Sequence, residues 1–360
     1  MARELAAAGR LGCYYSGYPL WKLPHSEAAR IRTHSFRTTV VYGLQRLLPV
    51  WARPDPWMLY GWQDRGFDRW VGRVLAQSDF IHAMPGQCLK TFQRARELGV
   101  ATVLNHASSP IREWVRIMEP EYGRVGLRLS EACPYDSAYF ESADREYSLA
   151  DYHCVASTLG RDYLVALGIA AERIWVVPYA ADPEIFFPRP DGPVVPGFRI
   201  VFPGQVGLRK GIKTLLDALT LAAREDWRVD FFGAVVPEAT HDLASYRGKP
   251  RLHFHGAVSQ SLLAEAFRGA SVLALPSLEE GFSLVVPQAL NCGLPCITTD
   301  RNGAKDLIRQ HENGSVVPVQ DSEALLRELI WWERNPSRPK EIFLWSDAAR
   351  RLLTLSSNAL

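Results

Sequence analysis

The sequence predicts an α/β protein with parallel sheets in two domains. Short β-branched or aromatic runs alternate with longer helix-like stretches along nearly the whole chain, a pattern typical of βαβ units. The length of 360 residues exceeds what one hydrophobic core usually organises. A proline-dense segment near the middle separates two sets of strand candidates, so we expect one domain on each side of it.

Each half of the chain holds a set of strand candidates, and those of the first half lack an alternation of apolar and polar residues, which indicates burial on both faces. In the first half they are residues 11–16, 80–84, 101–106, 152–157 and 173–178. In the second half they are residues 199–203, 228–232, 252–255, 271–275, 296–299 and 315–318. Each set fits a doubly wound domain.

The proline-dense segment is the expected linker. It contains Pro178, Pro183, Pro188, Pro190, Pro193 and Pro196, a density that continues neither a helix nor a central strand. We therefore expect a first domain over 1–180, a linker over 181–197 and a second domain over 198–338. The final segment, 339–360, has apolar residues at helical spacing and is expected to pack back on the first domain.

Composition excludes several classes of protein. A net charge of +2 gives no indication of a nucleic-acid partner. No apolar run reaches the roughly 18 residues that cross a bilayer, and the opening residues lack a secretory-type apolar stretch, so we expect a cytoplasmic protein. The six scattered cysteines are expected to be reduced, mostly buried thiols.

The first 75 residues are locally basic. They hold eleven Lys or Arg against five Asp or Glu, with Trp51, Trp57, Trp62 and Trp70 among the arginines. One interpretation is a face that contacts an anionic lipid or an anionic acceptor, and thus a peripheral position on the cytoplasmic face of a membrane. The more ordinary one is a solvated basic surface over core tryptophans. Both stay open.

Two loops carry the candidate chemistry, because ligands of open parallel sheets bind beyond the carboxyl ends of the strands. After strand 199–203 comes GQVGLRKG, in which Gly204 and Gln205 precede Arg209 and Lys210. Glycines let a backbone approach a ligand closely, and two cations beside a helix start favour a phosphate. By itself this loop could equally be a glycine turn with solvated bases.

The loop after strand 271–275 gives the stronger pattern. Glu279 and Glu280 end the strand, and the next four residues, Gly281, Phe282, Ser283 and Leu284, lead into a helix that holds Gln288. Backbone N–H groups at a helix start suit a phosphate or a sugar hydroxyl. A carboxylate and a carboxamide about two turns apart suit the hydroxyls of a sugar and a ribose. An exposed acidic turn is the alternative explanation.

The segment LPSLEEGFSLVVPQALNCGLPCITTDRNGAKDLI resembles the signature of the family 4 (group 1) glycosyltransferases. Three further stretches are similar to family segments in the right order, and they begin ADYHCVASTLG, FPGQVGLRKG and HENGSVVPVQ. Together the similarity covers most of residues 145–330, and it is weaker upstream. Four ordered motifs are much harder to meet by chance than one.

The resemblance implies a GT-B fold, in which two Rossmann-like domains face each other across a cleft. It also implies a retaining transfer of a sugar from a nucleotide-diphosphate donor to a glycan, lipid-linked or small-molecule acceptor, with no cofactor and no obligatory metal. By this resemblance Lys210, helped by Arg209, binds the donor diphosphate and Glu280 contacts the transferred sugar. Gln288 then lies at the ribose.

The stretch ATVLNHASSP resembles the family segment that ends in a histidine at the cleft, which nominates His106 as a catalytic residue. The alternative is a histidine with a purely structural role, whose ring nitrogens are hydrogen-bonded inside the fold. His82 is a weaker candidate for a catalytic residue.

The chain departs from the family pattern at several positions. Gln288 stands where the family usually has a second glutamate, Gln205 where an arginine is common, and Ser283 and Ala180 replace common glycines. The first strand and glycine-rich loop of the family have no recognisable counterpart here, so these two motifs of the acceptor side are not matched. These departures keep open a degenerate, non-catalytic protein that binds nucleotide-sugars.

Other chemistries find less support in the sequence. A sugar-nucleotide epimerase or a phosphorylase could use the same architecture, but no lysine motif of the pyridoxal-binding kind is found. A metal site is not expected, because His253 and His255 share a strand face with no further ligand at suitable spacing.

Overall fold

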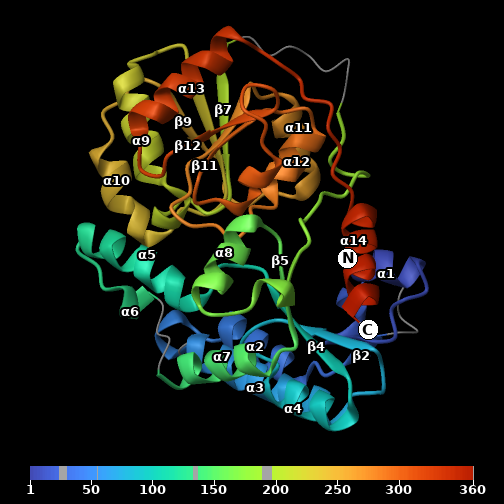
Figure 1. Ribbon diagram of the computed structural model, residues 1–360. Helices are drawn as coiled ribbons and strands as arrows, with labels where there is room; N and C mark the ends of the chain where they lie inside the picture. Colours follow the sequence, from blue (N-terminus) through green and yellow to red (C-terminus); the bar gives the residue numbers. More distant parts are fainter. Residues whose placement is uncertain (24–30, 55, 133–136, 189–196, 360) are drawn as a thin grey trace.

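The computed structural model describes residues 1–23, 31–54, 56–132, 137–188 and 197–359. Two parallel-sheet domains lie one above the other in Figure 1, the second domain at the top. The predicted α/β class with two such domains is confirmed.

The first domain is built on a four-stranded parallel sheet in the order β3-β4-β5-β6. These strands are β3 Phe80–Ala83, β4 Ala101–His106, β5 Tyr152–Val155 and β6 Ile174–Val176. A separate parallel pair joins β1 Tyr14–Ser16 to β2 Ile31–Thr33. The helices are α1 Ala2–Ala7, α2 Phe36–Leu47, α3 Pro56–Val74, α4 Leu89–Leu98, α5 Ile111–Arg124, α6 Leu129–Ala132, α7 Ser137–Leu149 and α8 Thr158–Ala166.

The second domain has a six-stranded parallel sheet in the order β12-β11-β10-β7-β8-β9. Its strands are β7 Arg199–Pro203, β8 Arg228–Phe232, β9 Arg251–Phe254, β10 Val272–Leu275, β11 Cys296–Thr299 and β12 Gly314–Val317. Its helices are α9 Ile212–Ala222, α10 Thr240–Ser245, α11 Gln260–Arg268, α12 Val285–Asn291 and α13 Ser322–Arg334. The chain enters at the centre of the sheet and reverses direction between β7 and β10, which makes a topological switch point there.

Burial explains why these strands form where they do. All four residues of β10 and of β11 are buried, as continuous apolar runs in a sheet covered on both faces require. The strand β3 is different, because none of its residues is fully buried and it lies at the edge of its sheet. The expectation of two buried faces, made for the strands of the first half, is confirmed at β4 and β5, where most residues are buried, and is wrong at β1 and β3.

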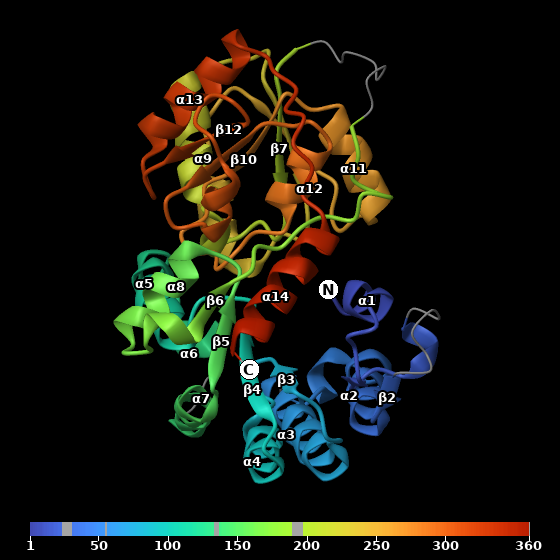
Figure 2. The same ribbon diagram turned by 45° about the vertical axis from the view of Figure 1, so that its right-hand side comes forward.

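The C-terminal helix α14 Trp345–Ala359 returns to the first domain, as predicted (Figures 1 and 2). Ala348 and Leu352 pack in one cluster with Val103 and Trp175. Arg351 Nε donates to the carbonyl of Val176 at 2.6 Å. The linker and the C-terminal segment meet at a bridge between Ala181 and Leu344.

Some details differ from the sequence expectations. The strand β2 was not predicted, and β1 starts at Tyr14 rather than at residue 11. Pro190, Pro193 and Pro196 lie outside the described residues, as does Cys133. The other five cysteines are free thiols, four of them buried and Cys13 half-buried.

Candidate functional site

The glycine loop after β7 places Lys210 against the end of β10. Gly204 and Gly211 both have positive φ, 102° and 72°. A Cβ atom at position 211 would lie 1.8 Å from the carbonyl oxygen of Pro276, so only glycine lets this turn approach the next strand. Lys210 ends the short 3₁₀ turn Leu208–Lys210, and its side chain lies beside Gly204. Gln205 is exposed.

Lys210 and Glu280 form an ion pair although 70 positions separate them in the chain. Each side chain is 12% exposed. Arg209 Nη1 lies 3.2 Å from the same carboxylate oxygen, Oε2 of Glu280. The structure thus brings the predicted diphosphate-binding cations and the predicted sugar-binding carboxylate together at the switch point of the sheet.

The two cations determine the ionisation of Glu280. Burial by itself raises the pKa of a carboxyl group, but Lys210 and Arg209 outweigh it and hold the pKa of Glu280 below its ordinary value. Glu280 is therefore a carboxylate at neutral pH, held between two cations of which Lys210 is nearly buried and Arg209 is partly exposed.

Glu279 belongs to the same cluster, and no role was predicted for it from the sequence. Its side chain is 1% exposed, and its Oε2 lies 3.6 Å from Arg209 Nη1. Both carboxylate oxygens are buried without a hydrogen-bond partner among the described residues. Burial raises the pKa of Glu279, and the nearby Ser109 hydroxyl and the Arg209 charge offset only part of that rise. The available signal was the pair of adjacent glutamates in the loop after β10, since both carboxylates lie near the same nitrogen, Nη1 of Arg209.

Loops of the first domain touch this cluster directly. A Cβ atom at Gly281 would lie 2.8 Å from the backbone of Ser108, in the loop after β4. Ser157, directly after β5, donates its hydroxyl to the carbonyl of Gly281 at 2.8 Å. The carboxyl ends of strands in both domains therefore meet at the candidate site.

Further contacts hold the two domains together around the site. Arg124 on α5 makes a bidentate pair with Asp242 on α10, with both N···O distances 2.8 Å. Thr158 donates its backbone N–H and its hydroxyl to Asp306. Met118 and Tyr122 on α5 pack in one apolar cluster with Leu208 and Leu278. The expected cleft is thus closed by direct contacts between the domains.

The turn before α12 keeps backbone donors free. Among the described residues, the N–H groups of Gly281, Phe282, Ser283 and Leu284 make no hydrogen bond. Phe282 is buried edge-on against Tyr179, and Ser283 is buried, whereas Leu284 is 42% exposed. Gln288 is half-buried on α12.

The His106 ring packs inside the first domain. Its Nε2 lies 3.0 Å from Nδ1 of His153, and both rings contact Tyr147. Burial, with the neighbouring His153 adding to it, lowers the pKa of His106 to about 3, so the ring is neutral. Its Nδ1 has no hydrogen-bond partner among the described residues. The structure does not bring this ring into contact with Lys210 or Glu280, although the residues that follow it touch Gly281.

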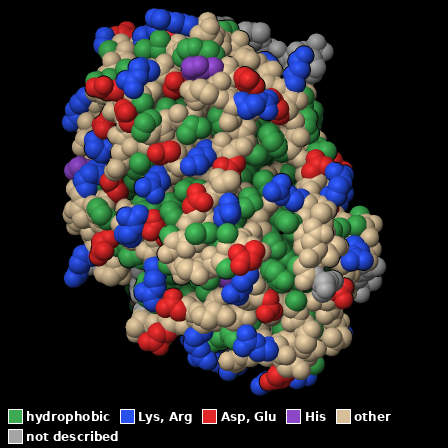
Figure 3. Space-filling model, viewed as in Figure 1, with side chains coloured by type: hydrophobic (Ala, Val, Ile, Leu, Met, Phe, Trp, Pro, Cys, Tyr) green, Lys and Arg blue, Asp and Glu red, His purple; other side chains and the backbone are tan. Residues whose placement is uncertain are grey.

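Other sequence candidates lie away from the cluster. His82 is exposed on the edge strand β3 near Trp175. His255 binds Asp230 at 2.7 Å. Across the described ranges, no three His, Cys, Asp or Glu side chains are grouped so that they could hold a metal ion. Charged side chains of both signs are interspersed over the face in Figure 3, in line with the low net charge.

Comparison with known proteins gives the family. Residues 191–344, which include both loops of the cluster, match the family described as "Glycosyl transferases group 1". The solved sucrose-phosphate synthase of Thermosynechococcus elongatus, a GT-B protein, superposes over 99% of this chain and 91% of its own, with a TM-score of 0.68 and 19% identity. The second domain belongs to the group 1 glycosyltransferases, and the whole chain has the GT-B fold.

Two other proteins extend the comparison. It is 24% identical to "MMP alpha-(1->4)-mannosyltransferase" of Mycolicibacterium hassiacum over 100% of its own length and 93% of that relative. The structure of Anabaena Alr3699/HepE in complex with UDP-glucose covers 96% of both chains, with a TM-score of 0.61 and 15% identity. Two further relatives align over only 24% and 56% of their own lengths.

Proposed function

We propose that this protein is a retaining glycosyltransferase that moves a sugar from a nucleotide-diphosphate donor to an acceptor hydroxyl, in glycan, polysaccharide or glycolipid synthesis. The observation that carries the proposal is the cluster of Lys210, Arg209 and Glu280 at the switch point, facing loops of the first domain. The mannosyltransferase relative and the UDP-glucose complex of the Anabaena protein support a nucleotide-sugar donor.

Donor binding exchanges the partners inside the cluster. The diphosphate forms ion pairs with Lys210 and Arg209. The free N–H groups of Phe282, Ser283 and Leu284 lie at the same strand end and donate hydrogen bonds to the diphosphate oxygens. Glu280, released from Lys210, accepts hydrogen bonds from sugar hydroxyls. Gln288, on the helix α12 that follows this turn, binds the ribose. Gly204 and Gln205 form the near wall of the phosphate position.

Transfer then requires the diphosphate to leave with its developing negative charge. Fixed cations and N–H donors stabilise that charge most strongly when water is excluded, and the closed contacts around Gly281 exclude it. The acceptor hydroxyl attacks on the face that the diphosphate leaves, and its proton passes to the leaving phosphate. The unpaired Nδ1 of His106 orients the sugar from the first domain.

A divalent metal is not needed in this scheme, because Lys210 and Arg209 supply the charge that neutralises the diphosphate. Turnover unchanged by a chelator supports this part of the proposal, and loss of turnover restored by Mg²⁺ overturns it.

We also propose a cytoplasmic protein with peripheral membrane contact. Within 14–60 several large apolar side chains are exposed, Trp51 at 88%, Leu47 at 83% and Trp21 at 73%, in the basic part of the chain. No helix of the described residues has the length and apolarity to cross a bilayer. Sedimentation with anionic vesicles that is lost in a Leu47→Ser/Trp51→Ser variant supports this contact, and equal sedimentation of the two proteins contradicts it.

Product analysis tests the proposed reaction. The protein is incubated with labelled UDP-, GDP- and ADP-sugars, and the products are separated and assigned by NMR. A glycoside with the anomeric configuration of the donor supports a retaining transferase. An inverted glycoside overturns retention, an epimerised donor indicates an epimerase, and no consumption of any donor supports the non-catalytic alternative.

A further inference from the structure

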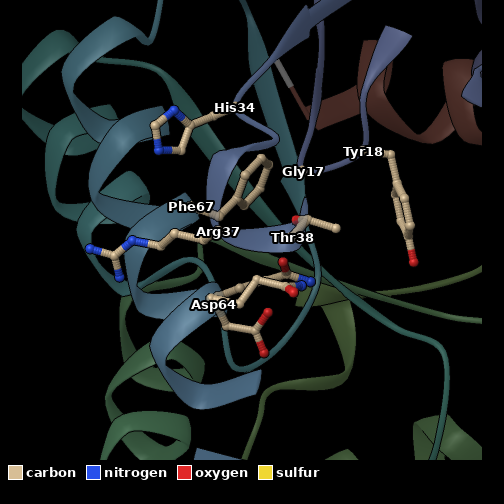
Figure 4. Close-up of a pocket in the computed structure, with 9 residues that line it drawn as sticks. Gly17, Tyr18, His34, Arg37, Thr38, Asp64 and Phe67 are labelled. Carbon is tan, nitrogen blue, oxygen red and sulfur yellow. The ribbon is translucent and has the colours of Figure 1, made fainter. Parts of the chain in front are cut away.

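A polar cavity lies entirely within the first domain. Its volume is about 190 Å³, which holds several waters or one small polyol. Thr38, Gln63, Asp64 and Gln87 line it with hydrogen-bonding side chains, and Figure 4 shows His34 and Arg37 on the side opposite Tyr18. This lining suits a ligand with several hydroxyl groups.

A second cavity of about 190 Å³ adjoins the first, because His34 and Arg37 line both. Arg69 and Arg73, one helical turn apart on α3, also line it. His34 stacks on Trp70, with ring centroids 5.3 Å apart. The second cavity is therefore bounded by three guanidinium groups and an aromatic wall.

The arginines around the second cavity keep their charge available. Among the described residues, Arg37, Arg69 and Arg73 make no ion pair with a carboxylate. Arg37 is held in place, since its guanidinium lies 4.3 Å from the Trp62 ring and donates to the Trp62 carbonyl. A Cβ atom at Gly66 would lie 2.4 Å from the Arg37 side chain, so the glycine leaves the room that this arginine occupies. Guanidinium forks match the geometry of phosphate oxygens.

The first cavity is lined in part by loops that follow strands of the first domain. Gly17 and Tyr18 follow β1, His34 follows β2, and Gln87 lies in the loop after β3. β3 pairs in parallel with β4, and the loop after β4 contacts Gly281. The carboxyl end of β3 is thus next to the strand end that touches the second domain.

We propose that the two cavities form the acceptor site and select a polyhydroxylated acceptor that carries a phosphate or phosphodiester group. The hydroxyl-bearing part occupies the cavity lined by Thr38, Gln63, Asp64 and Gln87, and the anionic group lies between Arg37, Arg69 and Arg73. That the ligand is an acceptor rests on the proposed glycosyltransferase function, whereas the anion site itself does not.

Calorimetric titration at low salt tests the site with a matched pair of probes, glucose 6-phosphate and glucose. The variant is Arg69→Gln/Arg73→Gln, and the control is Arg350→Gln, an exposed arginine on α14. We expect glucose 6-phosphate to bind the wild type at least tenfold more tightly than glucose. The double variant is expected to lose about tenfold or more of that affinity, and the control variant none.

A second set of titrations separates this site from the donor site. Saturating UDP and the Lys210→Ala substitution should leave the affinity for glucose 6-phosphate unchanged. Phosphatidylglycerol vesicles that displace the probe, when phosphatidylcholine vesicles do not, assign a lipid headgroup, and no displacement assigns a free phosphorylated acceptor.

The outcomes are distinguishable. Equal binding of the two probes, full affinity in the double variant, or competition by UDP overturns the anion site while leaving the transferase proposal intact. Absence of any nucleotide binding or sugar transfer, with glucose 6-phosphate still bound through Arg69 and Arg73, overturns the transferase proposal and leaves the anion site.

Discussion

The backbone of Gly281 lies so close to the backbone of Ser108 that no side chain fits between them. A Cβ atom at position 281 would come within 2.8 Å of both the Cα and the carbonyl carbon of Ser108. The turn that follows Glu280 in the second domain therefore rests directly on the first domain. The contact between the two domains at this point therefore requires a residue without a side chain at position 281.

The Gly281→Ala substitution is expected to impair closure rather than donor binding. The backbones must move apart, and overpacking of this kind typically costs about 1–3 kcal/mol. We expect kcat to fall about tenfold or more, with the affinity for a nucleoside diphosphate changed less than about threefold. Steady-state kinetics and calorimetry measure the two quantities. Gly123→Ala is the control, because its Cβ atom would meet nothing within 4 Å. A wild-type kcat in the Gly281→Ala variant would contradict the role of this close contact between the domains.

Glu279→Gln is expected to stabilise the protein and slow the reaction. Burial raises the pKa of Glu279, so the folded state disfavours the charged carboxylate above the ordinary pKa of the group. Removing that charge should raise the free energy of unfolding at pH 7 by roughly 1 kcal/mol. Activity should fall, since Arg209 loses a partner that positions it. Urea unfolding and initial rates test this, with the exposed Glu225→Gln as control; a less stable Glu279→Gln protein would contradict the prediction.

Gln288→Glu is expected to tighten donor binding. A carboxylate accepts hydrogen bonds from two ribose hydroxyls more strongly than a carboxamide does. We predict an affinity for UDP or GDP about three- to tenfold higher, and an affinity for inorganic pyrophosphate that is unchanged. Gln260→Glu, at the exposed start of α11, controls for the added charge. Equal gains for pyrophosphate and nucleotide would place Gln288 away from the ribose.

The His106 and His153 pair is expected to make stability fall between pH 7 and pH 5. Burial, together with the neighbouring His153, lowers the pKa of His106 to about 3. Burial, together with the charge of Arg173, lowers the pKa of His153 to about 4. In this range the unfolded chain takes up protons on both rings and the folded protein does not, so unfolding becomes easier as pH falls. Each ring contributes up to about 2 kcal/mol of the loss.

A His106→Phe/His153→Phe variant isolates this contribution, since it keeps two aromatic rings and removes the titration. Urea unfolding at the two pH values should give a clearly smaller difference for the variant than for the wild type. An identical pH dependence in both proteins would contradict the prediction, because it would mean that the two rings take up protons equally in the folded protein and in the unfolded chain.

Much of the fold follows from the sequence because buried parallel strands are continuous apolar runs. The strands β7 and β11 have the bounds expected from sequence, as does β4. The strand β2 could not be found this way, since Ile31–Thr33 is three residues long with no fully buried side chain. Short, half-buried strands leave too little periodicity to recognise.

Part of the candidate site was likewise predictable from the sequence, and part was not. The meeting of Lys210 and Glu280 was expected, because each follows a strand of one sheet and the carboxyl ends of parallel strands share an edge. The His106 and His153 contact was not expected, since it depends on the register that pairs Leu104 with His153 across β4 and β5. Glu279 is buried close to Ser109 of the first domain, and a contact between residues so far apart in the chain leaves no local pattern in the sequence.

The most direct test of the account is calorimetric titration of UDP, GDP and ADP into the wild type and a Lys210→Ala variant that circular dichroism shows to be folded. We predict one site for at least one of these nucleotides in the wild type, and a loss of about 10- to 100-fold in affinity when the Lys210 charge is removed. No binding of any nucleoside diphosphate at millimolar concentration, or wild-type affinity in the Lys210 variant, would contradict the claim that this cluster holds the donor.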